Sequence, residues 1–311
     1  MKRIGIDLMG SDGGYSVFPA PVEQFLKEET EYEITLFGSE EALKCFADRP
    51  DVKKVVSREA VDMDDGLLSV LRKKDSSMAK MLDALKEGEI DGALSAGSTA
   101  GLMALAHQRI PYIEGRKKAA LITALPTKVD KPFYLLDIGA NAELSSEEFI
   151  LLAQLGSEYA QKMGIKEPEV ALLNIGSEEV KGDNVHKEAY QLLKQCEAIH
   201  FKGNIEGRDL FEGEADVVVC DGFSGNISLK TMEGVASFSM SLLKGVFSSN
   251  LLAKMSALLV KKQLMQMREK IDYTYYGGAA LIGFCKPIVK AHGSSNEKAI
   301  YNAIQQVKKC L

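Results

Sequence analysis

The chain has 311 residues, a formal net charge of −6 and 46% hydrophobic residues, enough for the core of one large domain or two smaller ones. The negative charge argues against nucleic-acid binding, which depends on a basic surface that neutralises phosphates. The sequence contains no run of about 18 apolar residues, so no membrane-spanning helix is predicted. Asp7 lies where a signal peptide would be apolar, so we expect a cytoplasmic protein.

Short apolar or β-branched runs alternate along the chain with stretches of helical spacing. This alternation predicts an α/β fold with a mainly parallel sheet covered on both faces, a Rossmann-like α/β/α sandwich. We expect strands at Arg3–Leu8, Glu33–Phe37, Val52–Val56, Ile90–Ser95, Ala119–Ala124, Phe133–Ile138, Glu169–Ile175 and Asp216–Cys220. The expected helices include Ser76–Glu87, Gly101–Arg109, Ser146–Met163 and Asp183–Cys196.

The segment from about 238 to 270 stands apart, because its helical spacing continues too long for one crossover helix. Residues 248–250 (SSN) interrupt it and offer a cap for a second helix. We therefore expect a helical hairpin protruding from a single domain of residues 1–311, since no repeat or proline-rich linker marks a boundary. The apolar stripe around Leu258 and Leu259 suits a bilayer surface, a dimer contact or an ordinary core-facing helix.

Glycine, serine, threonine and asparagine gather directly after the predicted strands, where ligands bind in parallel α/β folds. Glycine lets backbone N–H groups turn toward an anion, and hydroxyl and amide side chains add hydrogen-bond partners. One such loop is more often a plain turn, but five together predict an anion-binding cleft. The five loops are residues 9–14, 95–99, 137–141, 174–177 and 221–226.

Nucleotide and metal signatures are missing from the sequence. Gly10–Gly14 does not match G-x-G-x-x-G and no phosphate loop of the Walker type occurs, so neither a dinucleotide nor ATP is predicted. Asp62, Asp64 and Asp65 lack the glycine and distal glutamate of a calcium loop. The five cysteines are scattered without C-x-x-C, which indicates reduced thiols and no zinc site.

Family-like motifs extend along almost the whole chain in order. They are residues 72–78 (RKKDSSM), 95–97 (SAG), 124–127 (ALPT), 137–141 (DIGAN), 174–182 (NIGSEEVKG), 203–207 (GNIEG), 219–226 (VCDGFSGN), 276–279 (YGGA) and 290–295 (KAHGSS). On these residues the sequence resembles the PlsX family, the acyl-ACP:phosphate acyltransferases. It departs from the family pattern at Gly97-Ser98-Thr99-Ala100, where Gly-Asn-Thr-Gly is usual, and at Ser11.

The resemblance implies an acyltransferase of fatty acid and phospholipid synthesis that moves a long-chain acyl group from acyl carrier protein to inorganic phosphate, with no metal or organic cofactor. It also implies a homodimer, loosely associated with the membrane, whose acyl phosphate passes to a membrane-bound glycerol-3-phosphate acyltransferase. Acyl carrier protein is acidic, so its docking site should use basic residues. The candidates are Arg72, Lys73, Lys74, Lys244, Lys254 and Arg268.

Two residues are predicted to be catalytic. Lys181 would fix phosphate or offset charge in the transition state, an expectation supported by the resemblance; otherwise it is a surface lysine. Asn226, at an expected helix start, would donate to the thioester oxygen, and its simpler interpretation is a helix cap. The predicted cleft contains Gly10, Gly97, Ser98, Thr99, Asn141, Asp221, Gly225, His292 and Ser294.

Several alternatives remain open at this point. His292 is a candidate to protonate the leaving thiolate, although a histidine that bonds a loop backbone is the simpler interpretation. Cys220 is a candidate for an acyl-enzyme, but no base accompanies it, which favours an inert buried thiol. The alternative functions are a phosphotransacetylase-like enzyme that uses acyl-CoA and a non-catalytic relative that binds acyl-ACP.

Overall fold

The computed structural model describes residues 1–271 and 277–311, and the strands within them form one large sheet. The strands are β1 (Lys2–Asp7), β2 (Tyr32–Gly38), β3 (Val52–Val56), β4 (Gly92–Ser95), β5 (Ala120–Leu125), β6 (Phe133–Leu136), β7 (Glu169–Asn174), β8 (His200–Glu206), β9 (Val217–Val219), β10 (Ala279–Ile282) and β11 (Ile288–Lys290). Their order across the sheet is β3-β2-β1-β4-β11-β10-β5-β6-β9-β7-β8.

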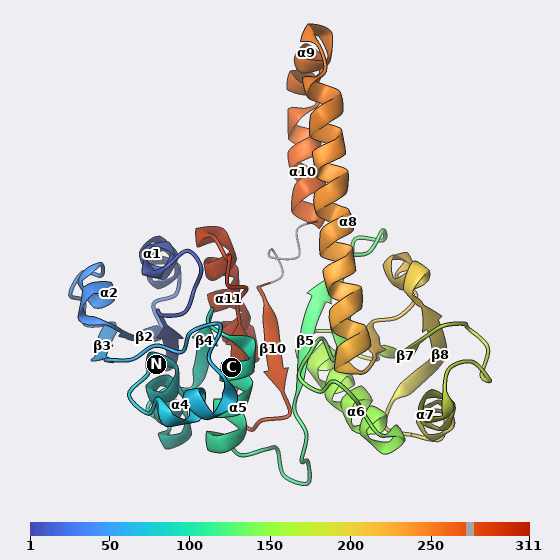
Figure 1. Ribbon diagram of the computed structural model, residues 1–311, viewed down its shortest axis with the longest axis horizontal. Coiled ribbons are helices and arrows are strands. Elements are labelled where there is room, and N and C mark those ends of the chain that lie inside the picture. The colour runs from blue at the N-terminus through green and yellow to red at the C-terminus, as the bar shows by residue number, and fades with distance from the viewer. Residues whose placement is uncertain (272–276) are drawn as a thin grey trace.

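Apart from those in a projecting hairpin, the helices cover both faces of this sheet (Figure 1). The helices are α1 (Pro19–Glu28), α2 (Glu40–Lys44), α3 (Leu67–Arg72), α4 (Ser77–Glu87), α5 (Thr99–Arg109), α6 (Ser146–Lys162), α7 (Asn184–Lys194), α8 (Gly222–Ser248), α9 (Leu251–Leu259), α10 (Lys261–Ile271) and α11 (Glu297–Cys310), of which α9 and α10 lie in the hairpin. One core cluster joins α4, α5 and the start of α8 to one face of the sheet. On the other face, α1 and α11 pack over the N-terminal strands, and α6 and α7 over the later ones.

The sheet is mostly parallel but changes direction in its middle. Strand β10 is antiparallel to both β11 and β5, and β5 is antiparallel to β6. After these three reversals β6, β9, β7 and β8 run opposite to β1, β4 and β11. The prediction of an α/β fold is confirmed, but the five predicted loops do not all follow strand ends at the same edge of the sheet.

Several elements were not predicted from the sequence. Strands β10 and β11 are only four and three residues long, and Gly278 and Gly283, both with positive φ, flank β10. Such short runs form strands because neighbours on both sides pair with them, which no local pattern reveals. Strand β8 and helices α1, α2, α3 and α11 were also missed.

The helical hairpin is confirmed as a projection that stands away from the body of the molecule (Figure 1). Its first helix begins at Gly222 and not near 238, because glycines and serines hide the helical period in its first turns. Asn250 caps α9 as predicted, accepting a hydrogen bond from the Ala253 N–H at 2.8 Å. Leu258 and Leu259 are 73% and 84% exposed, so the core-facing interpretation of α9 is wrong. Among the described helices, none is long and apolar enough to cross a bilayer.

Candidate functional site

Two of the predicted loops, residues 9–14 and 95–99, and the loop of the KAHGSS motif follow the ends of β1, β4 and β11. Gly10, at φ +79°, packs so closely that a Cβ atom there would lie 3.0 Å from the Gly97 Cα atom. The Ser11 hydroxyl and the Asp12 N–H both donate to the Gly293 carbonyl, at 3.0 and 2.9 Å. The N-terminal loop is thereby fixed to the loop of His292 and Ser294.

Polar side chains lie in register at the ends of these three strands. Asp7 pairs with Ser95 in the sheet, and Ser95 pairs with Lys290. The Ser95 hydroxyl donates to the buried Asp7 carboxylate at 2.7 Å. Burial raises the pKa of Asp7 and lowers the pKa of Lys290 to about 8. Lys290 is 8% exposed and donates to the Ala291 carbonyl, so an ammonium group lies inside the N-terminal half of the site.

His292 lies directly above this strand end. Its Nδ1 atom is 2.8 Å from the Ser294 hydroxyl and 3.2 Å from the Ser294 N–H. Its Nε2 atom is 3.5 Å from the Lys230 ammonium of α8. Burial and the nearby Lys230 charge lower the pKa of His292. The contacts within the loop match the simpler interpretation of this histidine, while Lys230 was not predicted.

Ser98 and Thr99 stand where α5 begins. The Ser98 hydroxyl accepts a hydrogen bond from the Gly101 N–H at 3.2 Å and so caps the helix. Thr99 is the first helical residue, and its side chain is exposed. Ser98 therefore has a structural task, and its predicted contact with substrate remains a prediction.

The loops of the C-terminal half are organised by the buried carboxylate of Asp137. It accepts hydrogen bonds from the N–H groups of Leu121, Gly139, Ala140 and Asn141 and from the Asn141 side chain. The Asn141 amide also donates to the Ala119 carbonyl at 2.8 Å. Its two donors are thus already engaged in holding the loop. Asp221 caps α8, with its carboxylate accepting from the Ser224 N–H at 2.8 Å.

Gly225 allows α8 to press against the end of β6. A Cβ atom at this position would lie 1.9 Å from the Asp137 carbonyl oxygen and 2.7 Å from the Cys220 sulfur. No real contact is this short, so Gly225 is required for packing. Its predicted role in binding substrate is therefore not needed to explain this glycine.

This packing predicts that Gly225→Ala destabilises the fold by about 3 kcal/mol or more, because a backbone carbonyl cannot yield easily. Gly234→Ala on the same helix is the matched control, since nothing lies within 4 Å of its added Cβ. We expect this control to stabilise the protein by about 0.5–1 kcal/mol. Urea unfolding measures both, and similar midpoints for the two variants would contradict the assigned packing role.

Asn226 lies in the second turn of α8 and not at its start, so the helix-cap interpretation is wrong. Its exposed side chain faces Gly139, whose added Cβ would be 3.1 Å from the Asn226 Nδ2 atom. Within the described part of the chain, no hydrogen bond engages this amide. Asn226 is therefore placed to donate to an added group.

Lys181 belongs to the loop between β7 and α7. Its stem packs on Gly176, and its ammonium lies 3.8 Å from Glu178 with 45% of the side chain exposed. The base of α7 reaches α8 through His186, whose Nε2 atom is 3.9 Å from the Asp221 carboxylate. Lys181 and Asn226 thus follow parallel strands of the same half of the sheet.

Helix α8 links the two groups of loops. Asn226 faces Gly139 in one group, and Lys230, one turn further, contacts His292 in the other. Lys230 also pairs with Glu233 at 2.8 Å. Lys230, Glu233 and Lys290 were not in the predicted site. Lys290 opens the recognised KAHGSS motif, whereas only the i, i+4 spacing from Asn226 pointed to Lys230.

A large apolar pocket of about 1430 Å³ begins beside these turns. Leu229 and Met232 of α8 line its base together with Leu125 at the end of β5. Along the hairpin it is lined by residues that include Ala236, Met240, Leu243, Phe247, Ala257, Leu264 and Met267. Its size exceeds the usual range for small-ligand pockets, roughly 300–1,000 Å³.

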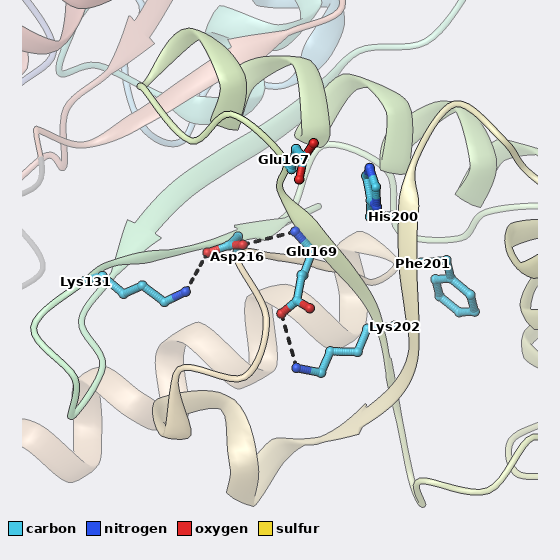
Figure 2. Close-up of a pocket in the computed structure, with 7 residues that line it drawn as sticks. All are labelled: Lys131, Glu167, Glu169, His200, Phe201, Lys202 and Asp216. Carbon is cyan, nitrogen blue, oxygen red and sulfur yellow. Dashed lines mark hydrogen bonds and ion pairs between the residues drawn. The ribbon is translucent and has the colours of Figure 1, made fainter.

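A second pocket, of about 530 Å³, lies near the opposite ends of β7, β8 and β9 (Figure 2). Figure 2 shows two ion pairs in it, Lys131 with Asp216 at 2.9 Å and Lys202 with Glu169 at 3.2 Å. None of the predicted site residues lines it. Both of its lysines are paired with carboxylates at the strand starts.

Cys220, the candidate for an acyl-enzyme, is buried at the end of β9. Cys220 is 1% exposed, and burial raises the pKa of its thiol well above the usual value. The prediction of a buried thiol at Cys220 is confirmed. Among the residues that the structure describes, no group of three potential metal ligands is present.

Comparisons with known proteins show the family of this chain. A family model described as "Fatty acid synthesis protein" matches residues 2–311. The chain is 45% identical over 307 residues to a phosphate acyltransferase of Lysinibacillus sphaericus, covering 98% of this chain and 93% of the relative. The chain belongs to this family. It is the PlsX family that the motifs predict, and the prediction of a phosphate acyltransferase is confirmed.

Further similarities agree with this membership. A phosphate acyltransferase of Staphylococcus aureus is 42% identical over 310 residues, with 99% of the PlsX chain and 94% of the relative covered. Among solved structures, a phosphotransacetylase from Streptococcus pyogenes superposes with a TM-score of 0.63 over 99% of this chain and 94% of the other. At 19% identity, this structural likeness concerns the fold alone.

Proposed function

We propose that the chain transfers a long-chain fatty acyl group from acyl carrier protein to inorganic phosphate and releases acyl phosphate. The observation that carries this proposal is the arrangement along α8. Asn226 and Lys230 present polar groups on its first turns, and the 1430 Å³ apolar pocket begins at Leu229 on the same turns. A polar centre at the base of an apolar pocket suits an acyl thioester, with its carbonyl at α8 and its chain along the hairpin.

The reaction needs no nucleophile from the protein. A phosphate oxygen attacks the thioester carbonyl, the C–O bond forms, and the C–S bond breaks as the tetrahedral intermediate collapses to acyl phosphate and thiolate. The Asn226 amide donates to the oxygen on which negative charge develops. Lys181 supplies positive charge from the loop after β7, and the departing thiolate takes its proton from His292 or from water.

The pocket supports a long-chain acyl donor. The alternatives are a phosphotransacetylase-like enzyme that uses acyl-CoA and a non-catalytic acyl-ACP binder. The test supplies phosphate with palmitoyl-ACP, palmitoyl-CoA or acetyl-CoA and traps acyl phosphate as its hydroxamate. We expect product from palmitoyl-ACP. Turnover of acetyl-CoA alone would establish the first alternative, and tight palmitoyl-ACP binding without product would establish the second.

We also propose a Rossmann-like arrangement for the N-terminal half of the sheet. The order β3-β2-β1-β4 is the same as the first four positions of the Rossmann strand order, and it supports a Rossmann-like α/β/α arrangement there. We propose that residues 1–311 act as a single domain with the hairpin as its extension. One sheet running through both halves supports this view.

The hairpin is proposed as the contact surface for partners. Its exposed apolar residues suit a second copy of the chain in a homodimer and loose attachment of a cytoplasmic enzyme to a membrane, where a glycerol-3-phosphate acyltransferase would consume the product. Lys244 and Lys254 line the pocket and are better placed for acyl carrier protein than Lys73, which is held by Asp62 and Asp65. The side chain of Arg268 lies outside the described residues.

Membrane attachment is tested by flotation with anionic liposomes. Replacing Leu258 and Leu259 with Glu should abolish flotation, because burying these side chains in the interface contributes about 1.5–3 kcal/mol each. The matched control replaces Leu67 and Leu68, which are 61% and 69% exposed on α3, with Glu. Equal flotation of both double variants would exclude the hairpin tip as the anchor.

A further inference from the structure

We propose that Lys230, Lys290 and His292 form the seat of the orthophosphate nucleophile, a role that rests on the proposed function. Two ammonium groups and an imidazole are groups that bind an oxyanion, and here they come from different elements of the fold. Lys290 ends β11, His292 follows it in the next loop, and Lys230 arrives from α8. Neither lysine belongs to the residues predicted for the cleft.

The geometry brings two of these groups, Lys230 and His292, into contact. The Lys230 ammonium is 3.5 Å from the His292 Nε2 atom. The Ser294 N–H points at the other ring nitrogen, at 3.2 Å, which favours the tautomer that carries its proton on Nε2. That proton and the Lys230 ammonium then face each other as two donors. An oxyanion between them would accept from both.

Lys290, two residues before His292, adds a buried charge that acts electrostatically on both members of this pair. Among the described residues, no carboxylate lies within ion-pair distance of its ammonium, which donates to the Ala291 carbonyl. An ammonium group with 8% exposure is costly to maintain unless something compensates it. A phosphate dianion supplies that compensation directly.

The carboxylates around the seat set the balance of charge. Asp12 and Asp7 attract Lys290 from beyond contact distance, and Lys230 repels it. Asp7 is engaged by the Ser95 hydroxyl and the Met9 N–H. Glu233 binds Lys230 through one oxygen, while its other oxygen is buried and has no hydrogen-bond partner in the described part of the chain. Glu233 therefore competes with phosphate for Lys230.

The seat also lies at the right place for the reaction. Lys230 is one helical turn from Asn226, so their side chains emerge on the same face of α8 about 5–6 Å apart at Cβ. A phosphate held at Lys230 is thus adjacent to the amide proposed to receive the thioester oxygen. The nucleophile comes from the N-terminal half of the sheet and the acyl donor meets it along α8.

The experiment varies phosphate at saturating palmitoyl-ACP for Lys230→Gln, Lys290→Met, Glu233→Gln and the control Lys309→Gln, an exposed lysine on α11. We expect the first two changes to raise the KM for phosphate about tenfold or more, with the KM for palmitoyl-ACP within about twofold. Glu233→Gln should lower the KM for phosphate, because it removes the competing carboxylate. The control should match the unchanged protein. Lys230 is exposed enough that its variant tests the proposal even if Lys290→Met does not fold.

Two results would overturn the proposal. One is an unchanged phosphate KM in Lys230→Gln. The other is a KM that these variants raise for palmitoyl-ACP but not for palmitoyl-N-acetylcysteamine, a donor without the phosphodiester of the carrier's prosthetic group. That pattern would mean that the lysines bind this phosphodiester and not inorganic phosphate. Calorimetry of inorganic phosphate with the full chain, without a donor, separates this proposal from the proposed function. Loss of phosphate binding in Lys230→Gln supports the seat even if no acyl donor is turned over.

Discussion

Replacing Asn226 or Lys181 with alanine should lower kcat by about one to three orders of magnitude, the range for removal of a single transition-state donor. Asn226 faces Gly139 with an amide that no described residue engages, so its loss removes a donor without breaking a structural bond. Lys181 pairs only loosely with Glu178, at 3.8 Å, and its loss likewise removes charge more than structure. Hydroxamate trapping of acyl phosphate measures the rates.

The matched controls are two exposed residues of α7, Asn184→Ala and Lys187→Ala, which lie close in sequence to Lys181. Both should keep kcat within about twofold, because surface changes away from special features have small effects. A folded Asn226→Ala enzyme with a normal kcat would refute the donor role. Equal losses in all four variants would mean that the effects reflect general damage.

Filling the apolar pocket should convert the enzyme from long to short donors. Ala236 lines the pocket on the third turn beyond Asn226, and Ala236→Phe would occupy space needed by the distal part of a chain. Excluding about four methylenes from the pocket costs about 3 kcal/mol, at about 0.8 kcal/mol each. We expect kcat/KM to fall about 100-fold for palmitoyl-ACP and little for octanoyl-ACP.

Leu242→Phe is the control for this experiment, because Leu242 is a 55% exposed residue of the same helix that does not line the pocket. Its kcat/KM should be unchanged for both donors. A parallel loss of palmitoyl and octanoyl activity in Ala236→Phe would place the acyl chain elsewhere.

The sequence predicted those elements whose local residue pattern matches their place in the folded protein. Strands such as β1 and β4 are buried apolar runs, and Asn250 caps α9 where a capping residue interrupts the helical spacing. Strand β10 escaped prediction because four residues between glycines become a strand only by pairing on both sides. Both neighbours of β10 run in the same direction, so the reversal that divides the loops into two groups occurs at the antiparallel pair β5 and β6. The sequence predicted both of these strands but not the direction of their pairing.

The predicted site shows the same division between local and tertiary information. Glycines marked the loops correctly, yet Gly225 serves the close packing of α8, and the Asn141 amide holds its own loop. Local sequence cannot separate a glycine or amide that binds a ligand from one that supports the backbone. Lys230 carried no loop signal because it lies inside a helix, and its relevance depends on a contact with His292 sixty-two residues away.

A crystal structure of the enzyme with phosphate and a non-hydrolysable palmitoyl-pantetheine analogue tests the central claim most directly, namely that α8 brings the nucleophile and the thioester together. The account predicts phosphate between Lys230 and His292, the analogue's carbonyl oxygen within hydrogen-bond distance of the Asn226 amide, and the acyl chain along the hairpin. Phosphate or carbonyl density away from the first turns of α8 would contradict it.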